Sequence, residues 1–499
     1  MQVQQVESRE DGERANGVPG GEQEYRVYTR RWAMLALFCM LGLMCSLLQM
    51  TYAAVQDISR LYYGVSTTEI NLMATSYMLA FPPFTLAAAY VLHVSSLHVC
   101  LSIGMAFMAA GTWLRWIGAT PNGFIWAITG QSLTAIGQPF IVSTMTMFSA
   151  SWFEPERRTL ATTFASFTNV LGSGVAFGMN PAIVKTGSQL KDLTFGQAVF
   201  TSALALATFI FFRSRPPTPP SPAADAADSG KAVTKAAALE AAPLLGEQAT
   251  QPRATPGYKS LLTNVNFLII LLLFGLGFGA FQSYLTVLNQ ILLPEGFTTE
   301  EAGNVGVCVI GAGLFGAFAA GAVLDATHAF RPIIIAALTG LLGSQWWLFL
   351  RLSHMSVIEL YACSAASGFF VLAMTPVCLE LAVEVTFPVP ESASNGLMYM
   401  IGTGSAFVQV LALDALQDPH PPRKMTNSLW FLVIEWTVLY LLSFFIRPNY
   451  LRREHELAQA NAALAAPVGS GTSPAPAVAA AAPNPPTGPS LATAVAVNT

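Results

Sequence analysis

Amide and hydroxyl side chains recur inside long apolar stretches of this sequence, where they could together bind a small polar molecule. Burying such a group without a hydrogen bond costs about 2–7 kcal/mol, so each must find a partner or face water. As a group they indicate a polar, uncharged cavity, whereas for any one of them a hydrogen bond between helices is the simpler explanation. The residues are Gln49, Tyr52, Gln138, Asn169, Gln282, Tyr284, Asn289, Asn395 and Thr403.

Acidic residues also lie inside apolar stretches of the second half of the chain, and Glu380, Glu384 and Glu435 lie farthest inside them. Glu380 and Glu384 are four residues apart, so they share one face of a helix. Glu435 lies deepest within its stretch. An acid at the centre of a membrane helix costs about 2.5–3.5 kcal/mol on insertion scales. Gating or ion coupling would explain these acids, and structural partners are the alternative.

The pattern of reactive side chains does not favour an enzyme. The six cysteines form no CxxC or Cys/His cluster, and the six histidines are scattered over connections and the C-terminal region. The chain has no phosphate-binding loop and no basic face of the kind that nucleic acids require. We therefore expect no cofactor, no metal and no nucleic-acid partner.

The elements that must position these residues are membrane helices. Charged residues make up 10% of the chain and hydrophobic residues 53%, whereas soluble domains carry about 25% charged residues. A helix of about 20 apolar residues crosses the hydrocarbon core of a bilayer. Twelve apolar stretches meet this requirement, at 32–54, 70–93, 97–117, 122–151, 159–184, 193–212, 264–290, 302–324, 332–350, 357–384, 392–413 and 427–446.

The distribution of Lys and Arg predicts the orientation. With a cytoplasmic N-terminus, most of the 24 Lys and Arg residues lie on the cytoplasmic side, and the connections on the other side hold few, among them Arg60 and Arg115. Both termini are therefore predicted to be cytoplasmic. Segments rich in Pro and Ala cannot bury enough apolar surface to fold. The predicted divisions are a disordered N-tail (1–31), a first six-helix bundle (32–212), a disordered cytoplasmic linker (213–258), a second six-helix bundle (259–449) and a disordered C-tail (450–499).

The two halves also echo each other in sequence. Thr51-Tyr52 in the first span matches Ser283-Tyr284 in the seventh. Gln138-Pro139 in the fourth span matches Thr375-Pro376 in the tenth. Parallel repeats of six spans are the plan of the major facilitator superfamily. The predicted fold is therefore an all-α membrane protein with twelve transmembrane helices in two six-helix bundles, the major facilitator fold.

Several segments resemble solute carrier family 49, the feline leukaemia virus subgroup C receptor-related branch of this superfamily. They are Tyr28-Thr29-Arg30-Arg31-Trp32, Tyr63-Gly64-Val65-Ser66, the run TNVLGSGVAFGMNPAIV in the fifth span, and residues 274–292 and 380–397. The resemblance runs from about residue 25 to 450. It implies a twelve-helix transporter that works by alternating access, in a family associated with choline and ethanolamine, haem or pyridoxine.

The residues that line the cavity of the choline-type members transfer poorly. Gln49 stands where those members have an aromatic residue in the first span, and Thr403 falls near their glutamine in the eleventh. Asn169 is kept, but Val170 replaces the amide after it. The aromatic residue of the seventh span falls near Gln282. The resemblance thus implies the architecture and leaves the substrate open.

A charge pattern of the family survives in part. The connection after the second span lacks the usual acidic and basic residues, while Asp325 and Arg331 remain after the eighth. These two residues join Glu380, Glu384 and Glu435 as the predicted gating or coupling group.

We predict a facilitative transporter of a small organic solute, because the first bundle has no acidic residue inside a span. A proton-coupled exporter of an endolysosomal membrane is the alternative, and a non-transporting receptor or scaffold is a third possibility. The expected partners are the small-molecule substrate and the lipid bilayer, with the chain monomeric. Residues Glu240, Leu244 and Leu245 fit an acidic dileucine sorting signal that an adaptor could bind, so the plasma membrane and the endolysosomal membrane are both candidates.

Overall fold

A computed structural model describes residues 28–218 and 258–453, except residues 390, 419, 421, 448 and 449. Within these ranges, all regular elements are α-helices or short 3-10 helices. The described residues up to Arg452 belong to one compact unit.

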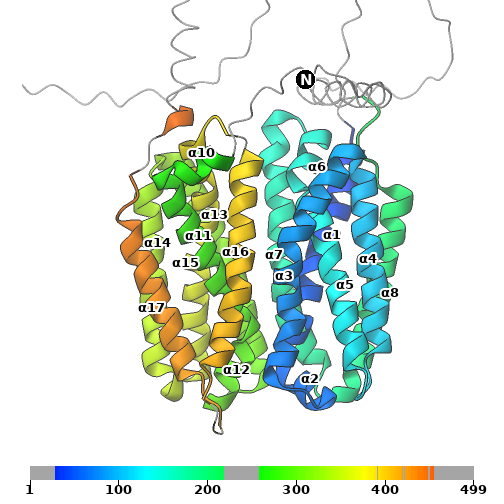
Figure 1. Ribbon diagram of the computed structural model, residues 1–499, viewed down its shortest axis with the longest axis vertical. Helices are drawn as coiled ribbons and strands as arrows, with labels where there is room; N and C mark the ends of the chain where they lie inside the picture. The colour runs from blue at the N-terminus through cyan, green and yellow to red at the C-terminus, as the bar shows by residue number, and fades with distance from the viewer. Residues whose placement is uncertain are drawn as a thin grey trace, which may run out of the picture. The chain divides into compact units, whose positions relative to one another are not determined.

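The first half of the chain forms one bundle, drawn from blue to green-cyan in Figure 1. Its elements are α1 (Arg30–Ala54), α2 (Gln56–Tyr63), α3 (Thr67–Val94), α4 (Leu97–Ile117), α5 (Phe124–Val142), α6 (Met145–Trp152), α7 (Pro155–Ile183), η1 (Gly187–Gln189) and α8 (Leu190–Phe211). Within it, α1 packs on α7, and α4 packs on α5 and α8.

The second half forms the other bundle, drawn from green to orange in Figure 1. Its elements are α10 (Tyr258–Thr263), α11 (Val265–Thr286), α12 (Leu288–Leu292), η2 (Leu293–Glu295), α13 (Thr299–Thr327), α14 (Phe330–Arg351), η3 (Leu352–His354), α15 (Val357–Thr386), α16 (Glu391–Ala415) and α17 (Thr426–Ser443). Here α13 packs on α15, and α11 packs on α16.

Among the described residues, eleven helices are long and apolar enough to cross a membrane. Each coincides with one of the twelve predicted spans. The remaining predicted span, 122–151, is divided into α5 and α6, with a break between Val142 and Met145. Helix α5 contains Gln131, Gln138 and Pro139. These residues lower its mean hydropathy, which explains why α5 is not counted among the eleven.

Local sequence signals set the helix boundaries in the same way in both halves. Ser66 and Glu69 form a capping box at the start of α3, and Thr298 and Glu301 form one at the start of α13. In each box the side chains satisfy backbone N–H groups that the first turn leaves without partners. The two helices are the second span of their respective bundles.

Glycines allow α4 and α5 to approach closely. Gly104 faces Gly137 and Gly111 faces Gly130, so two pairs lie seven residues apart on each helix. A Cβ atom on Gly111 would lie 2.5 Å from the carbonyl oxygen of Gly130. Small residues at such contacts are the usual basis of tight helix packing in membranes.

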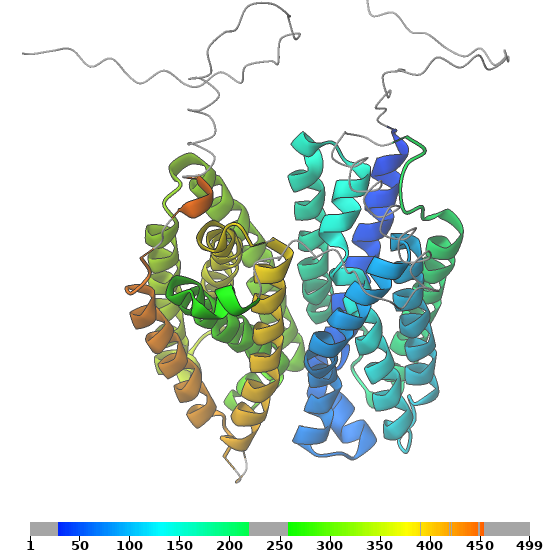
Figure 2. The ribbon, with the colours of Figure 1, turned by 45° about the horizontal axis from the view of Figure 1, so that its top comes forward.

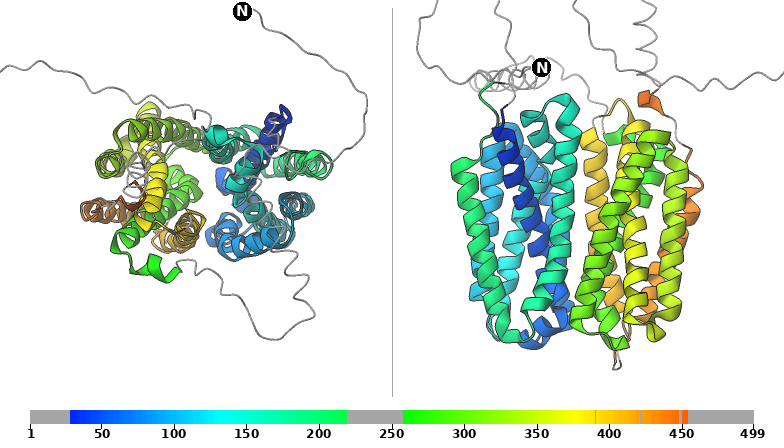
Figure 3. Two further views of the ribbon diagram at one scale, coloured as in Figure 1. Left: turned by 90° about the horizontal axis from the view of Figure 1, so that it is seen from above. Right: turned by 180° about the vertical axis from the view of Figure 1, so that it is seen from behind.

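The two bundles contact each other through α7 against α13 and through α3 against α16. The rings of Phe167 and Phe318, from α7 and α13, lie 4.2 Å apart between centroids. Figures 2 and 3 show the two groups of helices from other directions. We call the end where α2 and α12 lie the α2 end; α6 and α10 lie at the opposite end (Figure 1). The short helix η1 contacts α2 and so belongs to the α2 end.

Candidate functional site

Two of the predicted substrate-binding amides bind each other inside the first bundle. The Nε2 atom of Gln138 on α5 donates a hydrogen bond of 3.0 Å to Oε1 of Gln49 on α1. Both side chains are 7% exposed. Asn169 on α7 donates to the carbonyl oxygen of Gly42, which lies about two turns from Gln49 on α1. The face of α1 that bears residues 42 and 49 therefore contacts polar groups from both α5 and α7.

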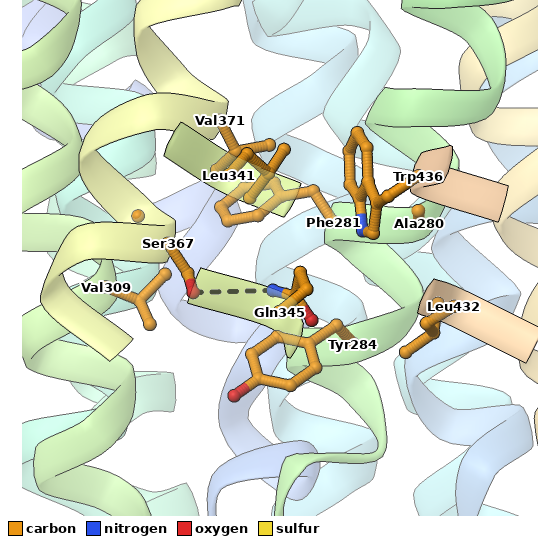
Figure 4. A pocket seen from close by; sticks show the side chains of 11 residues that line it. Ala280, Phe281, Tyr284, Val309, Leu341, Gln345, Ser367, Val371, Leu432 and Trp436 are labelled. Carbon is orange, nitrogen blue, oxygen red and sulfur yellow. Dashed lines mark hydrogen bonds between the residues drawn. The ribbon is translucent and has the colours of Figure 1, made fainter. Parts of the chain in front are cut away.

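Tyr284 instead lines a small cavity inside the second bundle (Figure 4). Phe281, Trp436 and Gln345 line the same cavity, and Gln345 donates to the hydroxyl of Ser367 at 3.4 Å. The cavity measures about 20 Å³, which is enough for about one water molecule. Tyr284 therefore lies among aromatic and neutral polar side chains of its own bundle.

Three further candidates bond locally or are partly exposed. The hydroxyl of Thr403 donates to Tyr399 and Met400 carbonyl oxygens of its own helix, α16. Asn395 reaches Glu391 on the same helix at 3.5 Å. Gln282 on α11 is half-buried. Among the described residues, no hydrogen bond links any of these three side chains to the Gln49–Gln138 pair.

Asn289, another predicted substrate-binding residue, joins the two bundles at the α2 end. The sequence did not predict this contact. The Nδ2 atom of Asn289 donates to the carbonyl oxygens of Ala53 and Ala54, each at 3.1 Å. These carbonyls belong to the last turn of α1, which ends where Val55 leaves the helical conformation (φ −130°, ψ 41°). Carbonyl groups at a helix end have no partner within the helix, so an amide from the other bundle caps α1.

Other polar pairs join the bundles at the same end. Gln290 on α12 donates to Oδ1 of Asn71 on α3 at 2.6 Å. Thr299 at the start of α13 donates to Oδ2 of Asp57 on α2 at 3.0 Å. Lys185 lies 2.5 Å from a carboxylate oxygen of Glu300. Two side chains of α3 also bond to Asp414 on α16; they are Thr68 and Asn71. We call this set, with Asn289, the polar seam.

The predicted gating residues lie elsewhere. Glu380 and Asp325 are exposed. Glu384 is half-buried and interacts with another group of the protein. Arg331 donates to the carbonyl oxygen of Phe444 at 2.8 Å, which ties the start of α14 to the end of α17. Asp325 and Arg331 form no recorded ion pair with each other in the described part of the chain.

Glu435 lies halfway along α17 and belongs to a chain of hydrogen bonds inside the second bundle. Ser283 on α11 donates to Oε1 of Gln409 on α16 at 3.3 Å. The Nε2 atom of Gln409 donates to Oε1 of Glu435 at 2.8 Å and to the carbonyl oxygen of Leu276 at 3.2 Å. The other carboxylate oxygen of Glu435 is buried and has no hydrogen-bond partner. This acid is therefore held by neutral groups, with one oxygen left open to a proton or a cation.

Arg115 is a functional candidate that the sequence reasoning missed, because its position near the end of a span assigned it to a connection. The structure places it inside the first bundle, with 1% of its surface exposed. Its Nη2 atom donates to Oε1 of Gln197 on α8 at 3.0 Å, and its guanidinium lies 5.0 Å from the ring centre of Tyr52. The charge is surrounded by neutral groups. The signal available in the sequence was an arginine within an otherwise apolar stretch, which is costly unless it is compensated.

The predicted sorting signal cannot be placed in this structure. The sorting-signal residues Glu240, Leu244 and Leu245 lie outside the described residues. In the described ranges, no group of three or more His, Cys, Asp or Glu side chains could hold a metal ion.

With this geometry established, comparison with known proteins identifies the family. The family model described as Major Facilitator Superfamily matches residues 33–408. The chain belongs to the major facilitator superfamily. Members of this superfamily are membrane transporters, so the apolar helices are those of an integral, multi-pass membrane protein.

Individual relatives and solved structures agree with this assignment. The chain is 27% identical to Solute carrier family 49 member A3 of Xenopus tropicalis over 414 residues, which is 80% of each protein. It is 27% identical to the human protein named Choline/ethanolamine transporter FLVCR2 over 440 residues, 86% of this chain and 79% of that protein. A crystal structure of a D-xylose-proton symporter matches with a TM-score of 0.63 and 13% identity, covering 84% of this chain and 97% of that one. The resemblance to solute carrier family 49 is therefore confirmed.

Proposed function

We propose that this protein is a facilitative transporter of a small organic solute of the choline or ethanolamine class, working by alternating access. The observation that carries the proposal is the polar seam, which joins the two bundles at the α2 end through side chains rather than through the chain itself. Contacts of this kind can break when the bundles rock apart, as transport by alternating access requires. The relatives named choline/ethanolamine transporters support the solute class.

In this proposal the α2 end faces the outside of the cell or the organelle lumen, and both termini lie on the cytoplasmic side. The excess of Lys and Arg at the opposite end supports this orientation. The polar seam is then the outer gate, and the structure corresponds to a state in which that gate is closed. The solute would pass between the bundles near the Gln49–Gln138 pair, whose amides lie on two helices of the first bundle.

A cationic ammonium group needs either an acid or aromatic faces to replace its water. Tyr52 does not offer a free face, because the guanidinium of Arg115 already lies over its ring. Three rings of the second bundle are better placed. Phe274 and Phe278 on α11 are nearly parallel, and Tyr399 on α16 is almost perpendicular to both at 5.2 and 5.6 Å. We propose that this aromatic cluster contacts the ammonium group.

Uptake by proteoliposomes tests the solute class. Purified protein would be reconstituted and offered labelled choline, ethanolamine, pyridoxine or haem, with and without a pH gradient. We expect uptake of choline or ethanolamine that is saturable and independent of the gradient. Uptake of none of the four solutes would contradict the proposed function.

A disulfide across the polar seam tests alternating access separately. Lys185→Cys with Glu300→Cys would place two thiols where an ion pair now joins α13 to the segment after α7. We expect oxidation to stop uptake and a reductant to restore it. The matched control is Trp347→Cys with Glu359→Cys, which joins α14 to α15 within one bundle, near the same end. If both disulfides leave uptake unchanged, the seam is not a gate.

A proton-coupled exporter is the second candidate, and Glu435 is the observation that favours it. One of its oxygens is buried without a partner, so a proton could bind there. The same liposomes distinguish the two candidates. If flux requires a pH gradient in the parent protein but not in Glu435→Gln, the protein is a proton-coupled exporter and the facilitative proposal is wrong.

An adaptor binding to Glu240, Leu244 and Leu245 would place the protein in endolysosomal membranes, and imaging of Leu244→Ala with Leu245→Ala tests that.

A further inference from the structure

We infer that Arg115 is the centre of a binding site for a small monovalent anion, a halide or a carboxylate, inside the first bundle. The guanidinium is buried, and its Nε and Nη1 atoms have no hydrogen-bond partner. No acidic side chain of the described residues forms an ion pair with it. A buried charge with open donors needs an opposite charge that can accept hydrogen bonds.

The neighbours of Arg115 compensate its charge only in part. Gln197 supplies one amide oxygen, and the ring of Tyr52 supplies a weak electrostatic attraction. The C-terminal end of α1 is also near, and a helix end carries about half a negative charge at most. Its carbonyl groups are already engaged, because Asn180 donates to Thr51 and Asn289 caps Ala53 and Ala54. Arg115 makes no recorded hydrogen bond to any of these carbonyls.

Further donors lie beside the guanidinium. The hydroxyls of Tyr52 and Tyr63 are both buried; they interact with each other, and Tyr63 also lies close enough to Arg115 to interact with its charge. The two tyrosines belong to one packed cluster, from α1 and α2. Gly130 on α5 lies against the side chain of Arg115, where a Cβ atom would be 3.0 Å from Cγ. The packing is therefore tight, and only a small anion would fit among these donors.

Two comparisons show what is particular to Arg115: one with another buried arginine, and one with the equivalent place in the second bundle. Arg31 is also buried, but it is paired with Glu154 at 2.5 Å. Tyr284 occupies in the second bundle the place that Tyr52 has in the first, three residues before a break in the helix. It shares its cavity with Gln345, which is neutral. Among the described residues, a charge that would attract an anion at this place is thus found in the first bundle and not in the second.

The test measures thermal stability and does not require transport, so it is independent of the proposed function. The full-length protein in detergent would be melted at constant ionic strength in sodium chloride, bromide or formate, with sodium gluconate as the reference. We expect a saturable rise of about 3 °C or more in chloride relative to gluconate, as ligand binding to the folded state predicts. We expect this rise to vanish in Arg115→Gln. The matched control is Arg351→Gln, an exposed arginine at the same end, which should keep the rise.

A second arm distinguishes the source of the anion. Trimethylglycine carries a carboxylate beside a quaternary ammonium, and choline carries the ammonium alone. A rise in melting temperature with trimethylglycine, but with neither chloride nor choline, assigns the site to the carboxylate of a solute. A rise with chloride assigns it to a free halide.

A second variant is needed in case Arg115→Gln does not fold. Tyr52→Phe with Tyr63→Phe keeps the charge and removes two donors, and should raise the half-saturating anion concentration about tenfold. Equal melting temperatures in all of these solutions, or a rise that survives in Arg115→Gln, would overturn the inference.

Discussion

Removal of the Asn289 side chain should open the α2 end of the protein. Its amide donates to the carbonyl oxygens of Ala53 and Ala54 across the boundary between the bundles. A typical hydrogen bond contributes about 1 kcal/mol net to the state that contains it. Asn289→Ala removes two such bonds, so it should weaken the closed state by about 2 kcal/mol, which lowers the ratio of closed to open molecules about 30-fold.

Rapid disulfide trapping can measure this shift. With cysteines at Lys185 and Glu300, a short pulse of oxidant reports the fraction of molecules in which the α2 end is closed. The exposed ion pair that these cysteines replace contributes about 0–1 kcal/mol, so the background is little perturbed. A closed-to-open ratio of about 10 in this parent would fall to about 0.3, and the trapped fraction would fall from about 90% to about 25%.

Thr286→Val provides the control for Asn289→Ala. Thr286 lies three residues away, and its hydroxyl bonds to the carbonyl oxygen of Gln282 on its own helix, so its loss should not shift the equilibrium. If the trapped fraction in Asn289→Ala equals that of the parent, the two bonds do not hold the gate, and the reasoning from the structure is wrong.

Three further predictions concern the interior of the bundles. Gln138→Leu should lower the melting temperature by leaving the Gln49 amide unsatisfied, at a cost of about 1–3 kcal/mol, and Gln49→Leu added to it should restore part of that loss. Thermal melting of the single and double variants in parallel would check this. Glu435→Gln keeps an acceptor for its amide partner, so a facilitative carrier should retain most of its uptake, and liposome flux at several pH values is the measurement. Gly316→Ala should destabilise the protein strongly because a Cβ atom there would lie 2.0 Å from a backbone oxygen, whereas Gly321→Ala meets nothing within 4 Å and should be tolerated; fluorescence size-exclusion after mild heating would compare the two.

The spans could be predicted from sequence because the bilayer imposes a length and excludes charge, and both constraints are local. The exception shows the limit of this reasoning. Residues 122–151 form two helices rather than one, since the first helix ends at Val142 and the next begins at Met145. The apolar residues on both sides of this break make the segment appear continuous in a hydropathy profile.

The positions of the polar residues in the sequence did not determine their partners. A hydrogen bond between helices depends on how each helix is rotated about its own axis, and the pattern of a helix buried on most sides gives little information on rotation. Gln49 and Gln138 face each other, whereas Thr403 faces the backbone of its own helix. Arg115 was missed for a related reason. Its closeness to the helix end suggested a connection, and only the packing of α5, α8 and the end of α1 around it makes it buried.

The two-fold repeat explains why one end of the protein holds the seam. In both bundles the first helix breaks at a valine, Val55 after α1 and Val287 after α11, and a short helix follows. The second residue after each break, Asp57 or Asn289, reaches across to the other bundle. Asn289 caps carbonyl groups at the end of α1, whereas Asp57 accepts a hydrogen bond from the hydroxyl of Thr299. Equivalent positions therefore supply both of these side chains that reach across, although their partners differ. The polar contacts between the bundles at this end thus involve one local irregularity that both halves repeat, whereas the buried charge of Arg115 departs from the repeat and therefore needs an explanation of its own.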